Sequence, residues 1–236
     1  MIPARFSIAA GLAVSLSVAT IAQLAAQQPQ YPKSSSTVPF TPATGRCLTP
    51  EQRKVNETYN QRERPTQPGD DQPFWDPEYL VGTWDIDMRT PESPLGPGGQ
   101  SLGTLTMQGD AKNGCLYTGT LKAEDSDGKS FTRAISAVYD PVKKVLTWTE
   151  KDSRGYTIVK QGPIGGELGG LFHHHFGDDP SAPATTFGGK KFRIKGVSEM
   201  SSPAYFKSDM QVSIDGAPFT TFGRITFEKQ LPGEGK

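Results

Sequence analysis

The sequence predicts an all-β protein, an up-and-down antiparallel β-barrel of about ten strands with a short N-terminal helix. Apolar and polar residues alternate from Tyr79 onward, as they do in strands with one buried face. The 26 glycines and 20 prolines are spread among β-branched residues, which favours many short strands joined by tight turns. No segment between the expected strands is long enough for a crossover helix, so sequence neighbours are expected to pair antiparallel. Closing such a meander into a barrel removes its exposed edges, and a two-sheet β-sandwich is the alternative.

Residues 1–26 have the pattern of a cleavable secretory signal peptide. Arg5 supplies a positive charge, residues 6–22 form an uncharged apolar run, and small residues lead to a cleavage site after Ala26. A permanent transmembrane helix is the alternative, but no positive cluster follows the run to stop its transfer. We therefore expect Sec-dependent export to a periplasmic or extracellular location, with no stable membrane anchor after cleavage.

Residues 27–73 are expected to form a proline-rich leader that includes a short polar helix at about residues 50–62. Thr49 is a good N-cap, Pro50 stands at the first helical position, and Gln52 completes a capping box. The helix is polar nearly all round, so it has little to hold it alone.

The sequence contains two cysteines, Cys47 and Cys115. In an oxidising compartment a lone pair is expected to form a disulfide, and two free thiols are the alternative. The bridge would pin the start of the helix to the strand domain, which we expect to span residues 74–230. Residues 231–236 are expected to form a flexible tail.

The first strand is expected at residues 83–89, where Trp84, Ile86 and Met88 share one face and charged residues occupy the other. Similar segments predict further strands near residues 102–108, 115–122, 130–139, 144–151, 155–161, 167–176, 190–198, 204–214 and 218–229.

The segment Gly82-Thr83-Trp84 resembles the Gly-x-Trp that opens the first strand of lipocalins, in which the tryptophan plugs the closed end of the barrel. A proline- and glycine-rich loop, Pro91–Gln100, follows this strand, where lipocalins carry their lid loop. Later segments resemble a family of bacterial secreted proteins with a lipocalin-like, calycin-type fold, namely Tyr139-Asp140-Pro141, Trp148 with Asp152-Ser153-Arg154-Gly155, and Ser213-Ile214-Asp215-Gly216. The resemblance covers about residues 74–230 and implies a fold but no reaction or ligand.

In lipocalins a basic residue on the last strand packs across this tryptophan, and the resemblance makes Arg224 the candidate. An inward Arg224 would leave Ile225 and Phe227 facing outward. Three interpretations stay open: those two residues cover a partner surface, the strand is bulged, or Arg224 is an exterior residue.

The favoured function is non-catalytic binding of a small apolar or amphipathic ligand in the barrel lumen, with access under the Pro91–Gln100 loop. The expected lining residues are Trp84, Ile86, Met88 and Trp148. A lumen filled by its own side chains is the alternative. The sequence has no Gly-x-Ser-x-Gly motif and its histidines have no evident nucleophile partner, so we expect a binding protein rather than an enzyme.

The three histidines lie together, and they support a second hypothesis, a metal- or haem-binding protein. On a strand, His173 and His175 point the same way and His174 the opposite way. Such a pair suits zinc or copper, with Asp178, Asp179 or Glu167 completing the site, and a haem ligand is a further alternative. A polar barrel edge with a half-buried, hydrogen-bonded His174 is the structural alternative. Beyond zinc or haem at this pair, we predict no cofactor.

The charge pattern argues against a nucleic-acid partner. Lys and Arg number 25, Asp and Glu number 25, and the basic residues are scattered rather than gathered on one face. A third hypothesis is a structural or assembly subunit in which the leader and helix of residues 27–73 bind a protein partner.

Overall fold

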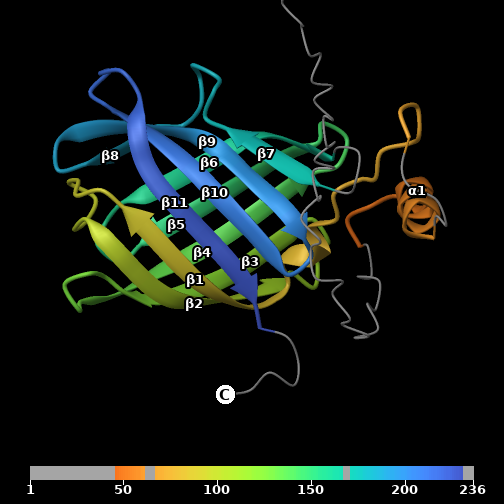
Figure 1. The fold of residues 1–236 in the computed structure, drawn as a ribbon, viewed down its shortest axis with the longest axis horizontal. Helices are drawn as coiled ribbons and strands as arrows, with labels where there is room; N and C mark the ends of the chain where they lie inside the picture. The colour runs from red at the N-terminus through yellow and green to blue at the C-terminus, as the bar shows by residue number, and fades with distance from the viewer. Residues whose placement is uncertain (1–45, 62–66, 167–170, 231–236) are drawn as a thin grey trace, which may run out of the picture. The chain divides into compact units, whose positions relative to one another are not determined.

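The computed structural model describes residues 46–61, 67–166 and 171–230, all within one compact unit, Thr41–Lys236. The predicted signal peptide of residues 1–26, nearly all of the leader before the helix, and the tail of residues 231–236 lie outside the described residues. The described chain confirms the all-β prediction: it is a closed antiparallel barrel of ten strands with one extra short strand and one α-helix (Figure 1). None of the helices in these ranges is long and apolar enough to span a membrane.

The strands follow the predicted alternation closely, and most of their bounds differ from the expected ones by only a few residues. They are β1 (Gly82–Thr90), β2 (Gly99–Gly109), β3 (Leu116–Glu124), β4 (Ser130–Asp140), β5 (Val145–Asp152), β6 (Thr157–Gly166), β7 (Phe172–Phe176), β8 (Thr185–Phe187), β9 (Lys190–Ser202), β10 (Tyr205–Ile214) and β11 (Thr220–Lys229). From β1 to β7 each strand pairs with the next, β9 pairs with both β7 and β10, and β11 closes the ring by pairing with β1.

The extra strand is β8, which the sequence did not predict. It pairs with the first residues of β9, Thr185 facing Phe192, whereas β7 pairs farther along β9, Phe176 facing Gly196. Both short strands therefore pair with the same edge of β9, the longest strand. β8 lengthens this part of the barrel wall but is not one of the ten strands that close the ring.

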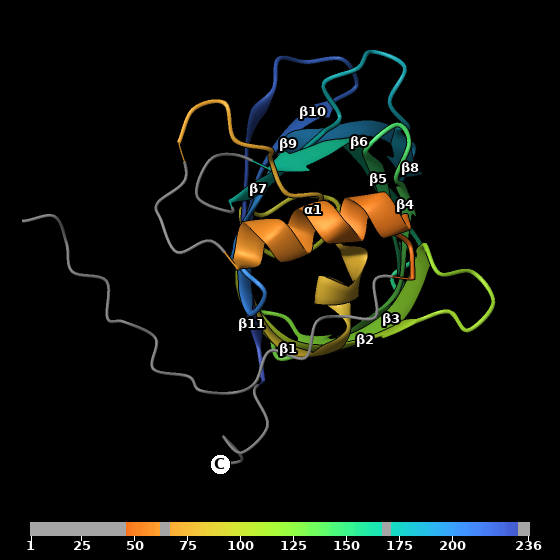
Figure 2. The ribbon, with the colours of Figure 1, turned by 90° about the vertical axis from the view of Figure 1, so that its right-hand side faces the viewer.

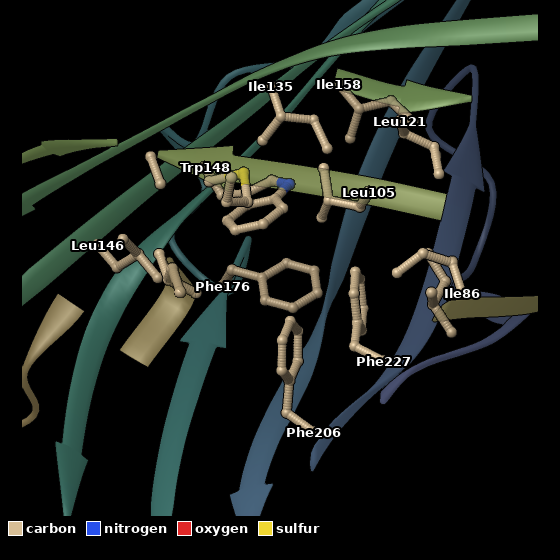
Figure 3. Packing of buried hydrophobic residues seen from close by; sticks show 14 of the residues in the cluster. Ile86, Leu105, Leu121, Ile135, Leu146, Trp148, Ile158, Phe176, Phe206 and Phe227 are labelled. Atoms are coloured by element: carbon tan, nitrogen blue, oxygen red, sulfur yellow. The ribbon is translucent and has the colours of Figure 1, made fainter. Parts of the chain in front are cut away.

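The middle of the lumen is filled by inward-facing apolar side chains. Phe206 and Phe227 stack with their ring centroids 3.9 Å apart, and Trp148 meets Phe227 edge-on at 6.4 Å. Figure 3 shows these rings together with Phe176 and the aliphatic side chains around them. A cavity beside Trp148 and Phe227, lined also by Arg133 and Glu150, measures about 10 Å³ and is too small for more than about one water molecule. The alternative of a filled lumen therefore holds for the centre of the barrel.

The helix α1 (Pro50–Asn60) lies across one end of the barrel (Figure 2). Its predicted capping box is present: the Thr49 hydroxyl accepts from the Gln52 amide, and the Gln52 side chain accepts from the Thr49 amide. The helix ends at Asn60, slightly before the predicted end, and none of its residues is buried. Its beginning is tied to the barrel by the predicted disulfide between Cys47 and Cys115.

A basic residue does pack across Trp84 at this end, but it is Lys229 rather than Arg224. The Lys229 ammonium lies 4.6 Å from the centre of the Trp84 ring and donates a hydrogen bond to the Tyr79 carbonyl. A short 3₁₀ helix, η1 (Pro77–Leu80), precedes β1, and its Leu80 carbonyl accepts from the Trp84 indole.

Arg224 is an exterior residue on a bulged strand. Its guanidinium pairs with Asp209 at 2.7 Å, and Ile225 is buried in the lumen. The pairing of β10 with β11 shifts register opposite Gly223, which has a φ of +115°. The shift allows Phe222 and Ile225, three positions apart, to point inward together.

Candidate functional site

The barrel end opposite α1 is covered by the loop of residues 91–98, which joins β1 to β2. The loop is two residues shorter than expected because Gly99 and Gln100 already belong to β2. A tight turn between Ser93 and Gly96 presents Leu95, which is buried, and the Ser126 hydroxyl donates to the Gly98 carbonyl. The loop thus folds inward over the barrel mouth.

A cavity of about 40 Å³ lies under this loop. Its apolar lining residues are Met88, Leu95, Phe131, Ile158, Met210, Phe222 and Ile225. Charged and polar residues also line it, among them Arg133, Glu150, Arg154, Tyr156 and Lys160, and the Arg154 guanidinium lies over the Phe131 ring at 4.1 Å. We call these five residues together with Asp152 the lumen cluster.

The lumen cluster is placed by strand parity. Arg133 on β4 faces Asp152 on β5 across the sheet, and Glu150 is two residues from Asp152 on the same face. Lys160 on β6 faces Trp148, which makes it a diagonal neighbour of Glu150. Three adjacent strands therefore bring charged side chains to one place inside the barrel.

The two carboxylates of the cluster are fully engaged. Glu150 accepts hydrogen bonds from the Lys160 ammonium at 2.6 Å, the Arg133 guanidinium at 2.8 Å and the Trp148 indole at 3.0 Å. Asp152 accepts from Arg133 at 2.8 Å, and from the backbone amide and the guanidinium of Arg154 at 2.7–2.9 Å.

These contacts keep both carboxylates ionised. Burial alone would raise the pKa of Glu150, but the nearby Lys160 and Arg133 charges outweigh it and lower the pKa to about 2. Burial likewise opposes ionisation of Asp152, and the hydrogen bonds from Arg154 and Arg133 bring its pKa to about 2. Burial raises the pKa of Tyr156 to about 12, so its phenol stays neutral. Near pH 7 three cations therefore face two carboxylates.

The predicted lining residues all point into the barrel, but they do not form one ligand chamber. Ile86, Met88 and Trp148 surround the small central cavity, and only Met88 also lines the cavity under the loop. Trp84 lies at the opposite end, beside α1.

The histidines alternate between the inner and the outer face of β7, as expected for consecutive residues of a strand. His174 is buried, with its Nε2 3.1 Å from the Leu146 carbonyl oxygen, and burial lowers its pKa to about 3. It is therefore more deeply buried than the half-buried residue expected. His173 and His175 lie on the outer face with ring centroids 6.0 Å apart, so neither reaches the lumen. In the described part of the chain no three His, Cys, Asp or Glu residues gather as a metal site, and zinc or haem at this pair stays a prediction.

A second cavity, of about 130 Å³, lies between α1 and the barrel and is mainly apolar. Trp84, Leu80 and Phe206 form its barrel side, and Tyr59 comes from α1. Two of its lining residues, Asn60 and Phe172, stand within two positions in the sequence of residues 62–66 and 167–170, which are not described, and we assign no site to it.

The charged residues that line the cavity under the loop of residues 91–98 were not predicted from the sequence, although the sequence contains a signal for them. Leu146, Trp148, Glu150 and Asp152 have the same parity along one strand, so a strand that buries Trp148 also buries the two carboxylates. Arg133 shares its parity with Phe131 and Ile135 in the same way. An inward charge on several adjacent strands is the pattern that would have revealed the cluster.

No protein-family model matches the chain, and no curated protein matches it by sequence. Solved structures that resemble it include Rv2717c from M. tuberculosis, at 15% identity over 65% of this chain and 94% of that chain, with a TM-score of 0.48. A de novo designed fluorescence-activating β-barrel has 15% identity over 65% and 95%, with a TM-score of 0.36. A redesigned barrel, mFAP1, bound to DFHBI, has 14% identity over 65% and 96%, with a TM-score of 0.34. Likeness at this level carries no information on function.

Proposed function

We propose that this protein binds a small amphipathic molecule, without catalysis, in the lumen beneath the loop of residues 91–98. The observation that carries the proposal is a buried charged cluster facing a cavity in a mainly apolar barrel interior. We also propose that the protein acts after export, as residues 1–26 suggest.

The buried charges are poorly explained by stability alone. Removing an ion from water costs several kcal/mol, and a buried ion pair is often no more stabilising than apolar residues of similar volume. Neighbouring layers of the same lumen are filled by residues such as Ile135 and Phe227. Polar groups that converge on a cavity with an apolar wall are typical of small-molecule sites.

The mixed lining of the cavity fits an amphipathic ligand. Met88, Met210 and Phe222 offer apolar contacts for its body, while Arg133 and Lys160 offer donors for its polar head. A volume of about 40 Å³ holds only about three water-sized groups, so a larger ligand requires the loop and Leu95 to move outward. Access under this loop agrees with the route expected from the sequence.

Binding suits the cluster better than acid–base catalysis. A general acid or base works best with a pKa near the ambient pH. Glu150 and Asp152 both have pKa values lowered to about 2, and Tyr156 has one raised to about 12. None of the three is suited to exchange protons near neutral pH.

The test is binding of the neutral fluorescent probe N-phenyl-1-naphthylamine, combined with native mass spectrometry of protein purified without denaturation. Leu95→Trp fills the cavity, and Leu102→Trp adds the same side chain at an exposed position on β2. We expect a saturable 1:1 complex that Leu95→Trp weakens about tenfold, the scale of overpacking a small site, and Leu102→Trp leaves unchanged. Equal affinities in the two folded variants, or no saturable binding to the wild type, would contradict the proposal.

A further inference from the structure

The cavity under the loop is lined by more positive than negative groups. Arg133, Arg154 and Lys160 all line it, and Glu150 is the one carboxylate among its described lining residues. Asp152 stands behind this surface and is bound to both arginines. With Asp152 included, the cluster still has one cation more than it has carboxylates.

The lumen cluster also has more hydrogen-bond donors than it has acceptors for them. Lys160 is buried, with 5% of its side chain exposed, and its ammonium group has three donors. Among the described residues its one hydrogen-bond acceptor is Glu150. Arg133 is similar, because one of its terminal nitrogens has only the Tyr156 hydroxyl, at 3.4 Å.

The carboxylate oxygens of the cluster are already hydrogen-bonded and cannot satisfy these remaining donors. Trp148, Lys160 and Arg133 occupy both oxygens of Glu150, and Asp152 is held on both oxygens by Arg133 and Arg154. The groups left to meet a ligand are therefore mostly N–H donors. Their natural partner is an acceptor-rich group that also carries the missing negative charge.

We infer that the head of the ligand is an anion, a carboxylate above all, bound by Lys160 and Arg133 under the loop of residues 91–98. This inference rests on the proposed function and names the chemical class of its ligand. A carboxylate has three non-hydrogen atoms, which matches a cavity with room for about three water-sized groups. A single hydrocarbon tail then lies along Met88, Met210 and Phe222.

Calorimetric titration with four octyl compounds of equal tail length tests the inference: octanoate, octyl sulfate, octanol and octylammonium. We expect octanoate to bind at least about tenfold more tightly than octanol, as one charge-assisted hydrogen bond allows, and octylammonium to bind most weakly. Octyl sulfate distinguishes the carboxylate from the larger sulfate head. If octanol binds as tightly as octanoate, the anion inference fails and the proposed function survives. If no octyl compound binds, both fail.

Two variants assign the effect to the cluster. Lys160→Gln removes the charge inside the barrel, and Lys151→Gln removes one on the exposed face of β5. Lys160→Gln is expected to bring octanoate to the affinity of octanol, whereas Lys151→Gln leaves the preference intact. Equal preference for octanoate in both variants would overturn the assignment.

A measurement on the wild type guards against a folding defect in Lys160→Gln. The carboxyl carbon of ¹³C-labelled octanoate reports its own pKa by NMR. Bound next to excess positive charge, its pKa should fall by at least about one unit relative to free octanoate. An unchanged or raised pKa would show that the head does not lie among these cations.

Discussion

At the scale of single residues, Glu150 couples the stability of the barrel to the lumen cluster. Its carboxylate holds Lys160, Arg133 and the Trp148 indole, groups contributed by three adjacent strands. Removing one partner of such a buried network leaves the others charged and without compensation, which is far more destabilising than losing an exposed ion pair.

Replacing Glu150 with Gln is expected to change the acid stability of the protein. Its pKa is lowered to about 2 in the folded chain from an ordinary value of 4.5, so its ionised form stabilises the fold above about pH 4.5. That stability is lost as the pH falls toward 2, and its size is on the order of 3 kcal/mol. Urea unfolding at pH 7 and pH 3 should show Glu150→Gln less stable at pH 7 and less sensitive to acid than the wild type.

Glu124→Gln is the matched control, because Glu124 is exposed on β3. It should keep the acid sensitivity of the wild type. A Glu150→Gln variant with the same loss of stability between pH 7 and pH 3 as the wild type would contradict the coupling.

The limits of prediction for the site also lie at this scale. Alternation placed Trp148 and Met88 inside the barrel, because apolar residues of one parity reveal a buried face. It did not locate the cavity under the loop of residues 91–98, since the shape of the lumen depends on which side chains meet across the barrel. Arg133 and Lys160 went unnoticed because an inward charge breaks the apolar pattern, and only its partners on other strands make it tolerable.

At the scale of elements, the strands were the most predictable part of the molecule. Each long strand alternates over many residues, and turn residues separate it from its neighbours. β8 was missed because three residues are too few to show a period, and its pairing depends on β9. Lys229 was not predicted as the basic residue beside Trp84, and the interpretations of Arg224 stayed open because sequence does not show where a strand is bulged.

The bulge in β11 makes a prediction of its own. Gly223 has a φ of +115°, and a Cβ atom there would lie 2.0 Å from the Arg89 carbonyl oxygen. Gly223→Ala is therefore expected to lower the free energy of unfolding by about 3 kcal/mol, combining backbone strain with a clash against β1. Chemical denaturation checks this value.

Gly165→Ala on β6 serves as the comparison, because a Cβ atom at that position meets nothing within 4 Å. It should change stability by well under half of the Gly223→Ala effect. Comparable losses in the two variants would mean that the bulge geometry does not limit this position.

At the scale of the whole molecule, the arrangement separates three regions of different character along the barrel axis. α1 and Trp84 lie at one end, packed aromatic side chains fill the middle, and the lumen cluster lies under the loop of residues 91–98. The packed middle isolates the two ends from each other. A ligand bound as we propose would therefore enter beneath the loop and would not pass through the barrel.

The export proposed from residues 1–26 predicts a defined mature chain. Expressed in a bacterial host with a Sec pathway, the full sequence of 25.5 kDa should be shortened by removal of residues 1–26. Intact mass measurement and N-terminal sequencing should then find Gln27 as the first residue. Recovery of the uncleaved chain in the membrane fraction would favour the transmembrane alternative.

The pairing of β11 with β1 also determines when folding can be completed. The two strands that close the ring, β1 ending at Thr90 and β11 beginning at Thr220, are separated by the 129 residues 91–219, so every intermediate strand must be available before the last edge is covered. A chain that is threaded through a membrane from its N-terminus therefore cannot close the barrel until residue 229 has emerged on the far side. Until then β1 presents an unpaired edge that can bind other chains. A polypeptide truncated before β11 would therefore aggregate rather than form a smaller barrel.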